Sequence, residues 1–499
     1  MASAPFRAII GRFSYAVSQR VIDQVLRAQP FEFGAFIAPE GAPPYFPPLP
    51  EGHQEWFLSG EIRGCHYRGV DWDALQPLDE ALVERMRECE CIFMDMVMRL
   101  EWKRSIPYVT RKRWYLRHLR FWNDYLSRRR INLYLAAWMP HEIPDIIIYY
   151  LCKDRGISVL YLDAGPVRDT SFAESDWQRS AVQLEERYGQ LSQEYGRVTD
   201  PEAIPLGDRF ARRYRALTTP GGETPPIEAV WRSTYWQAVR EMLLRRPVQA
   251  LRHLARFATP AGIGSLLHMR ERRKVIHDRN AFYNAHAIEP DFSRPYVYLT
   301  LHFQPEASTV PMAGAYVDQA LIAQLLNAHL PDDVLIYVKE HPRESGWLAR
   351  DVDSYRDFLE LKKVRFIARH TDTFALREHC SAVATATGTV GFEAIFRGKP
   401  VLLFGHRFFQ YAPGVFPIHT SEDCAKAIDA VFRDGAAPTL IQARLFLKAM
   451  EETSIHGVIN LWHHMVTEIP DDEHVRACTE GIIHQLEGLK RQEDEPRAA

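Results

Sequence analysis

The fold is decided by one stretch of the chain, Val383-Ala-Thr-Ala-Thr-Gly-Thr-Val-Gly-Phe-Glu-Ala-Ile-Phe-Arg-Gly-Lys-Pro-Val-Leu-Leu-Phe-Gly405. It predicts a buried strand, a glycine-containing turn, a short helix and, after Gly-Lys-Pro, a second buried strand. Small residues at the start of a helix let backbone N–H groups approach an anion, which the helix dipole also favours. The turn residues are Thr385, Thr387, Gly388, Thr389 and Gly391. Glu393 follows one turn into the helix and could hydrogen-bond a ribose; the alternative is a tight connection with no ligand.

The chain as a whole has the composition of a globular protein of more than one domain. Its 499 residues exceed one ordinary hydrophobic core, so two α/β domains are expected. The formal net charge of −3 does not point to a polyanionic partner. The seven scattered cysteines predict a reduced, cytoplasmic protein without disulfides, and no Cys or His spacing matches a structural zinc site. Cys89 and Cys91 are interpreted as a buried pair on a strand.

No segment of the sequence predicts insertion into a membrane. The N-terminus lacks the apolar region of a signal peptide, and no apolar run approaches the ~20 residues that cross a bilayer. Any membrane contact is therefore expected to be peripheral, at the inner face.

Residues 1–200 are predicted to form an N-terminal α/β domain on the acceptor side. A strand at 131–137, a helix from Asp145 to Lys153 and a strand at 157–162 make a βαβ unit, which implies a parallel sheet. Residues 91–98 are predicted as a further strand. The proline-rich residues 30–55 are predicted as a loop.

The rest of the chain is predicted to contain a basic helical connector at 201–290, a C-terminal α/β domain at 291–440 and a C-terminal helical segment at 441–499. The α/β rhythm of the C-terminal domain comes from strands at 296–301, 334–338 and 364–367 and from helices at 318–329 and 373–379. We expect two Rossmann-like domains facing across a cleft, with ligands at the carboxyl ends of the strands.

Polar side chains follow several strands of the C-terminal domain. His341, after its strand, could donate to a phosphate oxygen or act as an acid, and Lys339 could add positive charge. Arg407 could pair with a phosphate in a bidentate manner. The other candidates are His302, Gln304, Glu306 and His406. Each has an ordinary alternative as a strand exit or a surface loop.

In the N-terminal domain, the segment Pro140-His-Glu-Ile-Pro144 follows a strand in the same way. Glu142 is the candidate general base for an acceptor hydroxyl. Asp95 and Asp163 are predicted at other strand ends and compete for that role.

Two basic stretches, 103–130 and 243–274, favour contact with an anionic membrane surface. The first interleaves arginines with aromatic residues, and the second carries eight Lys and Arg against the single acid Glu271. RNA would suit the same charges, but no nucleic-acid-binding motif is present, so no nucleic-acid partner is expected. Solvated helix faces are the ordinary alternative.

The order of these motifs resembles the bacterial capsule polysaccharide biosynthesis family, which is similar to the Kdo- and sialic-acid-type glycosyltransferases of the GT-B fold. The resemblance rests on His302-Phe-Gln-Pro-Glu306, Val338-Lys-Glu-His-Pro342, Ala384–Ala394 and Gly398–Gly405. It implies a donor-phosphate role for His341-Pro342 and for the turn at Thr387-Gly388-Thr389. It supplies no general base with a matching motif.

The motifs together with this resemblance predict a glycosyltransferase that moves a sugar from a nucleotide-activated donor to a surface polysaccharide or lipid-linked acceptor. The resemblance alone implies a CMP-sugar as the first candidate donor. No DxD-type motif lies at a predicted strand end, so neither a metal nor another cofactor is expected. Glu393→Ala is expected to abolish donor binding without unfolding the protein. A nucleotide-sugar 2-epimerase of the same fold and a non-catalytic capsule assembly or export factor are the alternatives.

Overall fold

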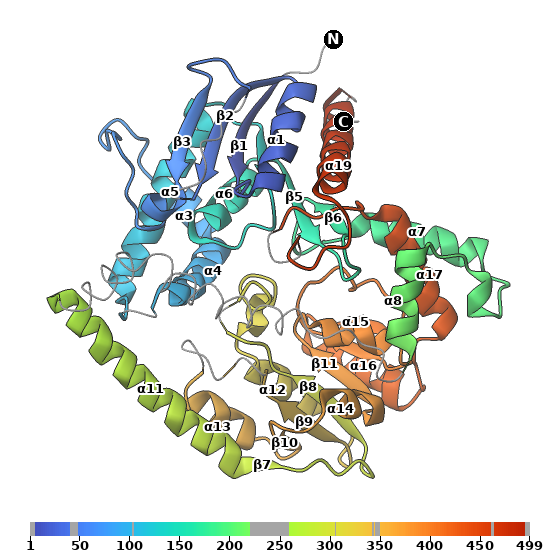
Figure 1. Ribbon diagram of the computed structural model, residues 1–499. Coiled ribbons are helices and arrows are strands. Elements are labelled where there is room, and N and C mark those ends of the chain that lie inside the picture. Colours follow the sequence, from blue (N-terminus) through green and yellow to red (C-terminus); the bar gives the residue numbers. More distant parts are fainter. Residues whose placement is uncertain are drawn as a thin grey trace, which may run out of the picture. The chain divides into compact units, whose positions relative to one another are not determined.

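The computed structural model describes residues 5–39, 48–101, 104–219, 259–304, 306–341, 344, 350–460 and 464–494 (Figure 1). The chain divides into two compact units. Unit 1 comprises Met1–Val97, Pro107–Leu191 and Ala449–Ala499, and unit 2 comprises Met98–Ile106 and Ser192–Lys448. Each unit is an α/β structure built on a mainly parallel sheet, so the predicted fold class of two Rossmann-like domains is confirmed.

The described part of unit 1 contains a six-stranded sheet in the order β3-β2-β1-β4-β5-β6. Neighbouring strands pair in parallel, except that β6 runs antiparallel to β5. Strand β1 pairs with both β2 and β4, with a register shift against β2 between Phe6 and Arg7, and its residues are almost all buried. The strands are β1 (Phe6–Gly11), β2 (Phe31–Ala38), β3 (Gln54–Leu58), β4 (Leu133–Ala136), β5 (Ser158–Ala164) and β6 (Ser171–Glu174).

One face of this sheet is covered by α1 and α19, which are far apart in the sequence and lie side by side in Figure 1. Val21 and Val25 of α1 and Ile482 and Leu486 of α19 enter one apolar cluster with the strands. Their spacing of four residues places each pair on one side of its helix. The helices of unit 1 are α1 (Ala16–Ala28), α2 (Ser59–Arg63), α3 (Glu80–Arg85), α4 (Arg87–Val97), α5 (Tyr108–Arg128), α6 (Ile143–Asp154), α7 (Val182–Glu194, which runs on into unit 2) and α19 (Asp471–Asp494).

The described part of unit 2 contains a seven-stranded sheet in the order β13-β12-β11-β8-β9-β10-β7, parallel throughout. Starting from β8, this is the doubly wound strand order of nucleotide-binding domains, with the short β7 added at one edge. The strands are β7 (Ala287–Ile288), β8 (Tyr296–Thr300), β9 (Leu335–Lys339), β10 (Val364–Ile367), β11 (Ala382–Thr385), β12 (Val401–Leu403) and β13 (Val415–Pro417).

Alternating residues of these strands enter the core of unit 2 on opposite faces. Val297 and Leu299 pack with α12 residues such as Ile322 and Leu326, whereas the Tyr296 hydroxyl donates to a carbonyl of α14. The helices are α8 (Asp208–Thr218), α11 (Pro260–His286), α12 (Ala320–His329), α13 (Asp353–Leu359), α14 (Thr373–His379), α15 (Thr389–Ile395), α16 (Ser421–Phe432) and α17 (Leu440–Thr453, which ends in unit 1). Three 3-10 turns, at Met98–Leu100, Pro201–Ala203 and Gly314–Val317, complete the described elements.

Two local predictions in the N-terminal part are wrong. Residues 91–98 belong mainly to helix α4, in which Cys89 is buried and Cys91 exposed, so these cysteines are not a strand pair. Asp95 also lies on this helix and not at a strand end. The predicted loop at 30–55 contains strand β2, whose Gly34–Ile37 segment is buried. Of the predicted basic connector, residues 220–258 lie outside the described part.

Candidate functional site

The candidate site lies at the carboxyl ends of β8 and β11 in unit 2. These neighbouring strands mark the point at which the order of the sheet reverses, where doubly wound sheets bind their ligands. His302 follows β8 by two residues, and Thr385 is the last residue of β11. The fold thus brings together two motifs that are 83 residues apart in the chain.

The imidazole of His302 joins the two strand ends through hydrogen bonds. The backbone N–H of Thr387 donates to Nε2 of His302 over 3.2 Å, and the Thr385 hydroxyl lies 3.0 Å from the same nitrogen. The hydroxyl oxygen of Thr385 accepts the backbone N–H of Gly388 over 3.0 Å and lies 3.2 Å from the hydroxyl of Thr300. The turn that the sequence singled out is therefore held by a histidine from another motif.

The hydrogen bonds define the protonation of His302. Burial, followed by the charges of His341, Arg350 and Arg407, lowers the pKa of His302 to about 3, so the ring is neutral at physiological pH. In a neutral imidazole one nitrogen accepts and the other donates. Because Nε2 accepts the N–H of Thr387, the proton is on Nδ1. His302 thus keeps an N–H donor at the switch point of the sheet.

The side chains of His341, Arg350 and Arg407 act electrostatically on His302. Arg350 is buried, and its Nη2 donates to the carbonyl oxygen of His302 over 2.8 Å, while its Nη1 lies 3.2 Å from Glu344. Arg407 donates to the sulfur of Met312 over 3.5 Å. His341, two residues beyond β9, is half-buried. Positive charge therefore gathers where an anionic ligand would bind.

Two glycines allow the turn to pack this closely. A Cβ on Gly388 would lie 2.8 Å from Oγ1 of Thr385 and 3.0 Å from Cε1 of His302. A Cβ on Gly405 would lie 2.7 Å from a backbone carbonyl oxygen, that of Met312. Gly388 precedes α15, whose first residue is Thr389, and no side chain caps this helix.

Two of the predicted site residues are engaged in structural hydrogen bonds. The ammonium of Lys339 donates to the carbonyl of Thr371, and burial lowers its pKa. The side-chain amide of Gln304 donates to the carbonyl of Val317. Both contacts fasten a strand end or loop to the rest of unit 2.

Three other predicted residues shape the loops beside His302. Glu306 accepts the hydroxyl of Ser308 over 3.2 Å, and the hydroxyl of Thr387 donates to the carbonyl of Ser308 over 2.7 Å. The loop after β8 is thereby bonded to the turn after β11. The ring of His406 stacks on that of His419 with centroids 5.2 Å apart.

Glu393 forms an ion pair with a buried arginine. Nη1 of Arg377, on α14, donates to Oε2 of Glu393, on α15, over 2.8 Å. The side chain of Arg377 is 2% exposed and that of Glu393 is 22% exposed. Removing the carboxylate would leave a buried cation without this partner. We therefore expect Glu393→Ala to lower the stability of the protein in addition to any effect on donor binding.

In unit 1, Glu142 belongs to a cluster of four charged side chains. It accepts a hydrogen bond from Arg63 and lies 3.4 Å from Nη2 of Arg12. Arg12 also donates from Nε to the buried Asp145 over 2.7 Å, and burial raises the pKa of that carboxyl group. Arg12 follows β1 with a left-handed φ of 70°, a strained conformation that often marks functional positions. Sequence analysis missed Arg12 and Asp145 as members of this cluster.

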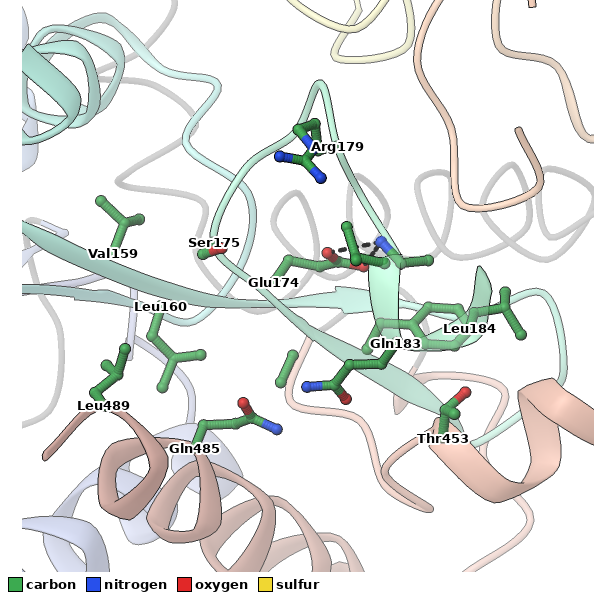
Figure 2. A pocket seen from close by; sticks show the side chains of 14 residues that line it. Val159, Leu160, Glu174, Ser175, Arg179, Gln183, Leu184, Thr453, Gln485 and Leu489 are labelled. Carbon is green, nitrogen blue, oxygen red and sulfur yellow. Dashed lines mark hydrogen bonds between the residues drawn. The ribbon is translucent and has the colours of Figure 1, made fainter. Parts of the chain in front are cut away.

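A separate cavity of about 220 Å³ lies in unit 1 beside β5, β6, α7 and α19 (Figure 2). Its polar lining includes Glu174, Arg179, Gln183 and Gln485. The carboxylate of Glu174 accepts the backbone N–H of Ala181 over 2.9 Å and so supports the wall of the cavity. No residue that the sequence predicted as functional is among the described residues that line it.

Several aromatic residues of the first basic stretch are core residues. Tyr115, Phe121, Trp122 and Tyr125 of α5 are buried, whereas Trp114 is half-buried and Tyr108 is 66% exposed. The four buried residues are therefore not available for a membrane contact through 103–130. Within the described ranges, no helix combines the length and the apolar character that a membrane span requires.

Two Rossmann-like units, one with a polar switch point, define a fold of the GT-B type. Residues 266–457 match the model of a family described as "Capsule polysaccharide biosynthesis protein". The resemblance that the motifs indicated is thus confirmed for this segment, which contains the whole candidate site of unit 2. No curated protein matches the chain.

Several solved structures are similar at low sequence identity. A KpsC of Thermosulfurimonas dismutans, named as a beta Kdo 2,7 transferase, is 12% identical over 81% of this chain and 97% of its own, with a TM-score of 0.30. The UDP-GlcNAc 2-epimerase of Methanocaldococcus jannaschii is 11% identical over 90% of this chain and 100% of its own, with a TM-score of 0.25. The MnaA of S. aureus in a co-structure with UDP is 9% identical over 92% of this chain and 95% of its own, with a TM-score of 0.26.

Proposed function

We propose that the chain is a glycosyltransferase that transfers a sugar from a nucleotide-activated donor to a surface polysaccharide or a lipid-linked acceptor. One observation carries the proposal: neutral His302, with its N–H on Nδ1, lies at the switch point of unit 2 under the charges of His341, Arg350 and Arg407. This combination suits the phosphates of a nucleotide sugar. The family description of residues 266–457 supports a role in capsule polysaccharide synthesis.

Each group at the donor side has a distinct proposed role. His302 donates to a phosphate oxygen without needing to ionise, so its contribution persists across physiological pH. His341 and Arg407 offset the negative charge that develops on the leaving phosphate as the glycosidic bond breaks. Glu393, held in place by Arg377, accepts a ribose hydroxyl. With cationic side chains in this position, transfer is proposed to proceed without a metal ion.

Unit 1 is the proposed acceptor side. Glu142 lies at the N-terminal cap of α6, forms an ion pair with Arg63 and is the proposed general base. The acceptor is proposed to be a glycan or lipid-linked molecule at the cytoplasmic face of the membrane. A CMP-sugar is the first donor to test.

The test of this proposal is a calorimetric panel of CMP, UDP, GDP and their sugars, followed by incubation of the best-bound donor with and without an acceptor glycan. Binding of a nucleotide and release of free nucleotide only with acceptor are the expected results. Conversion of the sugar without any acceptor would show an epimerase. Binding of no nucleotide would point to an assembly factor and overturn the proposal.

A further inference from the structure

Helix α11 exposes three large apolar side chains near its start. Ile263, Leu266 and Leu267 are 52%, 46% and 57% exposed, and their i, i+3, i+4 spacing puts them on one side of the helix. The helix begins at Pro260, after an N-cap in which the Thr259 hydroxyl oxygen accepts the N–H of Gly262 over 3.1 Å. These three residues are called the apolar tip below.

Exposed cations follow on the same side of the helix. Arg270, Arg273 and Lys274 are exposed and occupy the next two turns, with two exposed acids nearby, Glu271 beside them and Asp278 one turn beyond Lys274. They are called the basic collar. Tip and collar together extend over about 16 Å of helix, at ~1.5 Å per residue. Apolar and charged residues are therefore separated along the axis of α11 and not around it.

The opposite side of α11 is fixed to unit 2. Arg279 and Tyr283 are fully buried, and the hydroxyl of Tyr283 donates to the carbonyl of Ile367 over 2.8 Å. Nearer the tip, Nε2 of His268 lies 2.9 Å from the carbonyl oxygen of Glu101. The exposed side is thus held outward by contacts along the length of the helix.

The charge of this surface selects among its candidate partners. A second copy docked tip to tip about a two-fold axis would cover the apolar residues but would not match the charge of the collar. Nucleic acid would find a single exposed ring, that of His277, among the described residues of 259–278, which is too little to stack successive bases. An anionic lipid surface can bind both the apolar tip and the basic collar. The acyl chains bury the apolar side chains of the tip, and the anionic headgroups attract the cations of the collar. In the sequence, residues 243–258, which precede the described part of this helix, carry four arginines and no acid.

We propose that α11 docks this protein on an anionic phospholipid bilayer, with Ile263, Leu266 and Leu267 inserted below the headgroups and Arg270, Arg273 and Lys274 among them. An in-plane amphipathic helix needs its apolar residues along one whole face, which α11 lacks. Insertion by one end fits the order of residues along the axis. This docking goes beyond the transfer reaction and does not depend on it.

The experiment is cosedimentation of the full chain with phosphatidylcholine vesicles that do or do not contain phosphatidylglycerol. We expect binding to the anionic vesicles that weakens as salt is raised. Replacing the collar by R270Q, R273Q and K274Q should lower the partition coefficient on anionic vesicles about a hundredfold at low salt. Replacing the tip by I263S, L266S and L267S should lower it at least about tenfold and should also remove the binding that persists at high salt.

Matched controls separate docking from general surface effects. Leu321→Ser and Leu440→Ser remove leucines that are 39% and 44% exposed elsewhere in unit 2, and R433Q removes an exposed cation on another helix terminus. These variants should sediment with vesicles like the unaltered protein. Equal binding by the tip variant, or a dimer in light scattering that the tip variant abolishes, would overturn the proposal. Nucleotide binding by the tip variant should be unchanged, which keeps this test apart from that of the transfer reaction.

Discussion

The backbone N–H of Thr387 donates to Nε2 of His302 over 3.2 Å, which leaves Nδ1 of His302 as the donor nitrogen. One ring nitrogen therefore organises the turn, while the other carries the proton that the proposed donor contact requires. This division assigns two separable tasks to one side chain, and substitutions can test each task.

Asparagine and glutamine at position 302 should affect donor affinity and stability in opposite proportions. The amide of Asn takes the place of Nδ1, whereas the amide of Gln takes the place of Nε2. His302→Gln should keep the turn folded but weaken donor binding about ten- to hundredfold, the value of a lost hydrogen bond to a charged group. His302→Asn should retain more affinity and lose more stability. Calorimetry and urea unfolding measure the two quantities, with His370→Gln, at a position 77% exposed, as the control. Equal affinities for the two variants would contradict the assignment of Nδ1.

The stability of the protein should fall as the pH is lowered from about 6.5 towards 3. Burial lowers the pKa of both His302 and His118 from 6.5 to about 3. Between pH 3 and 6.5 the two histidines bind protons in the unfolded chain but not in the folded one, so the free energy of unfolding rises with pH. Their contribution to stability is complete above pH 6.5. Urea unfolding across this window measures the slope. His302→Gln and His118→Gln should each flatten it; a slope unchanged in both variants would refute the prediction.

The pair formed by Arg377 and Glu393 should be coupled in stability. Glu393→Gln or Arg377→Met alone should cost about 2 kcal/mol, less than the ~3–5 of a fully buried pair because Glu393 is partly solvated. The double variant should cost less than the sum of the single ones. Denaturant unfolding of all four proteins measures this coupling. Donor affinity is then compared only among variants that remain folded, which separates a ribose contact from a structural role.

Gly388→Ala should disrupt the site through the new methyl group alone. Its Cβ would lie 2.8 Å from the Thr385 hydroxyl and 3.0 Å from the His302 ring, so the network must open or shift at a cost of about 1–3 kcal/mol. The affinity for the nucleotide-sugar donor should fall together with the stability. Gly189→Ala is the control: this helical glycine of α7 has open space around it, and the change should stabilise the protein by about 0.5–1 kcal/mol. A Gly388→Ala variant with unaltered stability and affinity would exclude the close packing.

The sequence predicted the C-terminal α/β domain well because its elements carry local signals. The strand at 364–367 and the helix at 373–379 were predicted to the residue, and the pattern around Gly388 predicted β11, α15 and β12 in order. Three of these elements, β11, α15 and β12, are followed within three residues by a glycine, which short-range propensity detects.

Elements whose identity depends on distant contacts were missed. The apolar run at 91–98 suits a strand, but its burial follows helical spacing from Cys89 through Ile92, Phe93 and Met96. Strand β1 has too few residues to show a period, and without it Arg12 could not be placed beside Glu142. Arg350 belongs to no motif, although it follows Pro342 by eight residues, and only the path of the chain brings it to His302. Such residues reach a site through tertiary packing, which no local pattern encodes.

The position of α19 on α1 has a consequence for the order in which the protein can be made. Ile482 and Leu486 complete the apolar cluster of unit 1, yet they are synthesised after every residue of unit 2. When residue 448 is translated, all strands of unit 2 have been synthesised. Unit 1 still lacks α19, which together with α1 covers one face of its sheet. Unit 2 can therefore close its core during synthesis, and unit 1 must wait until the last helix emerges.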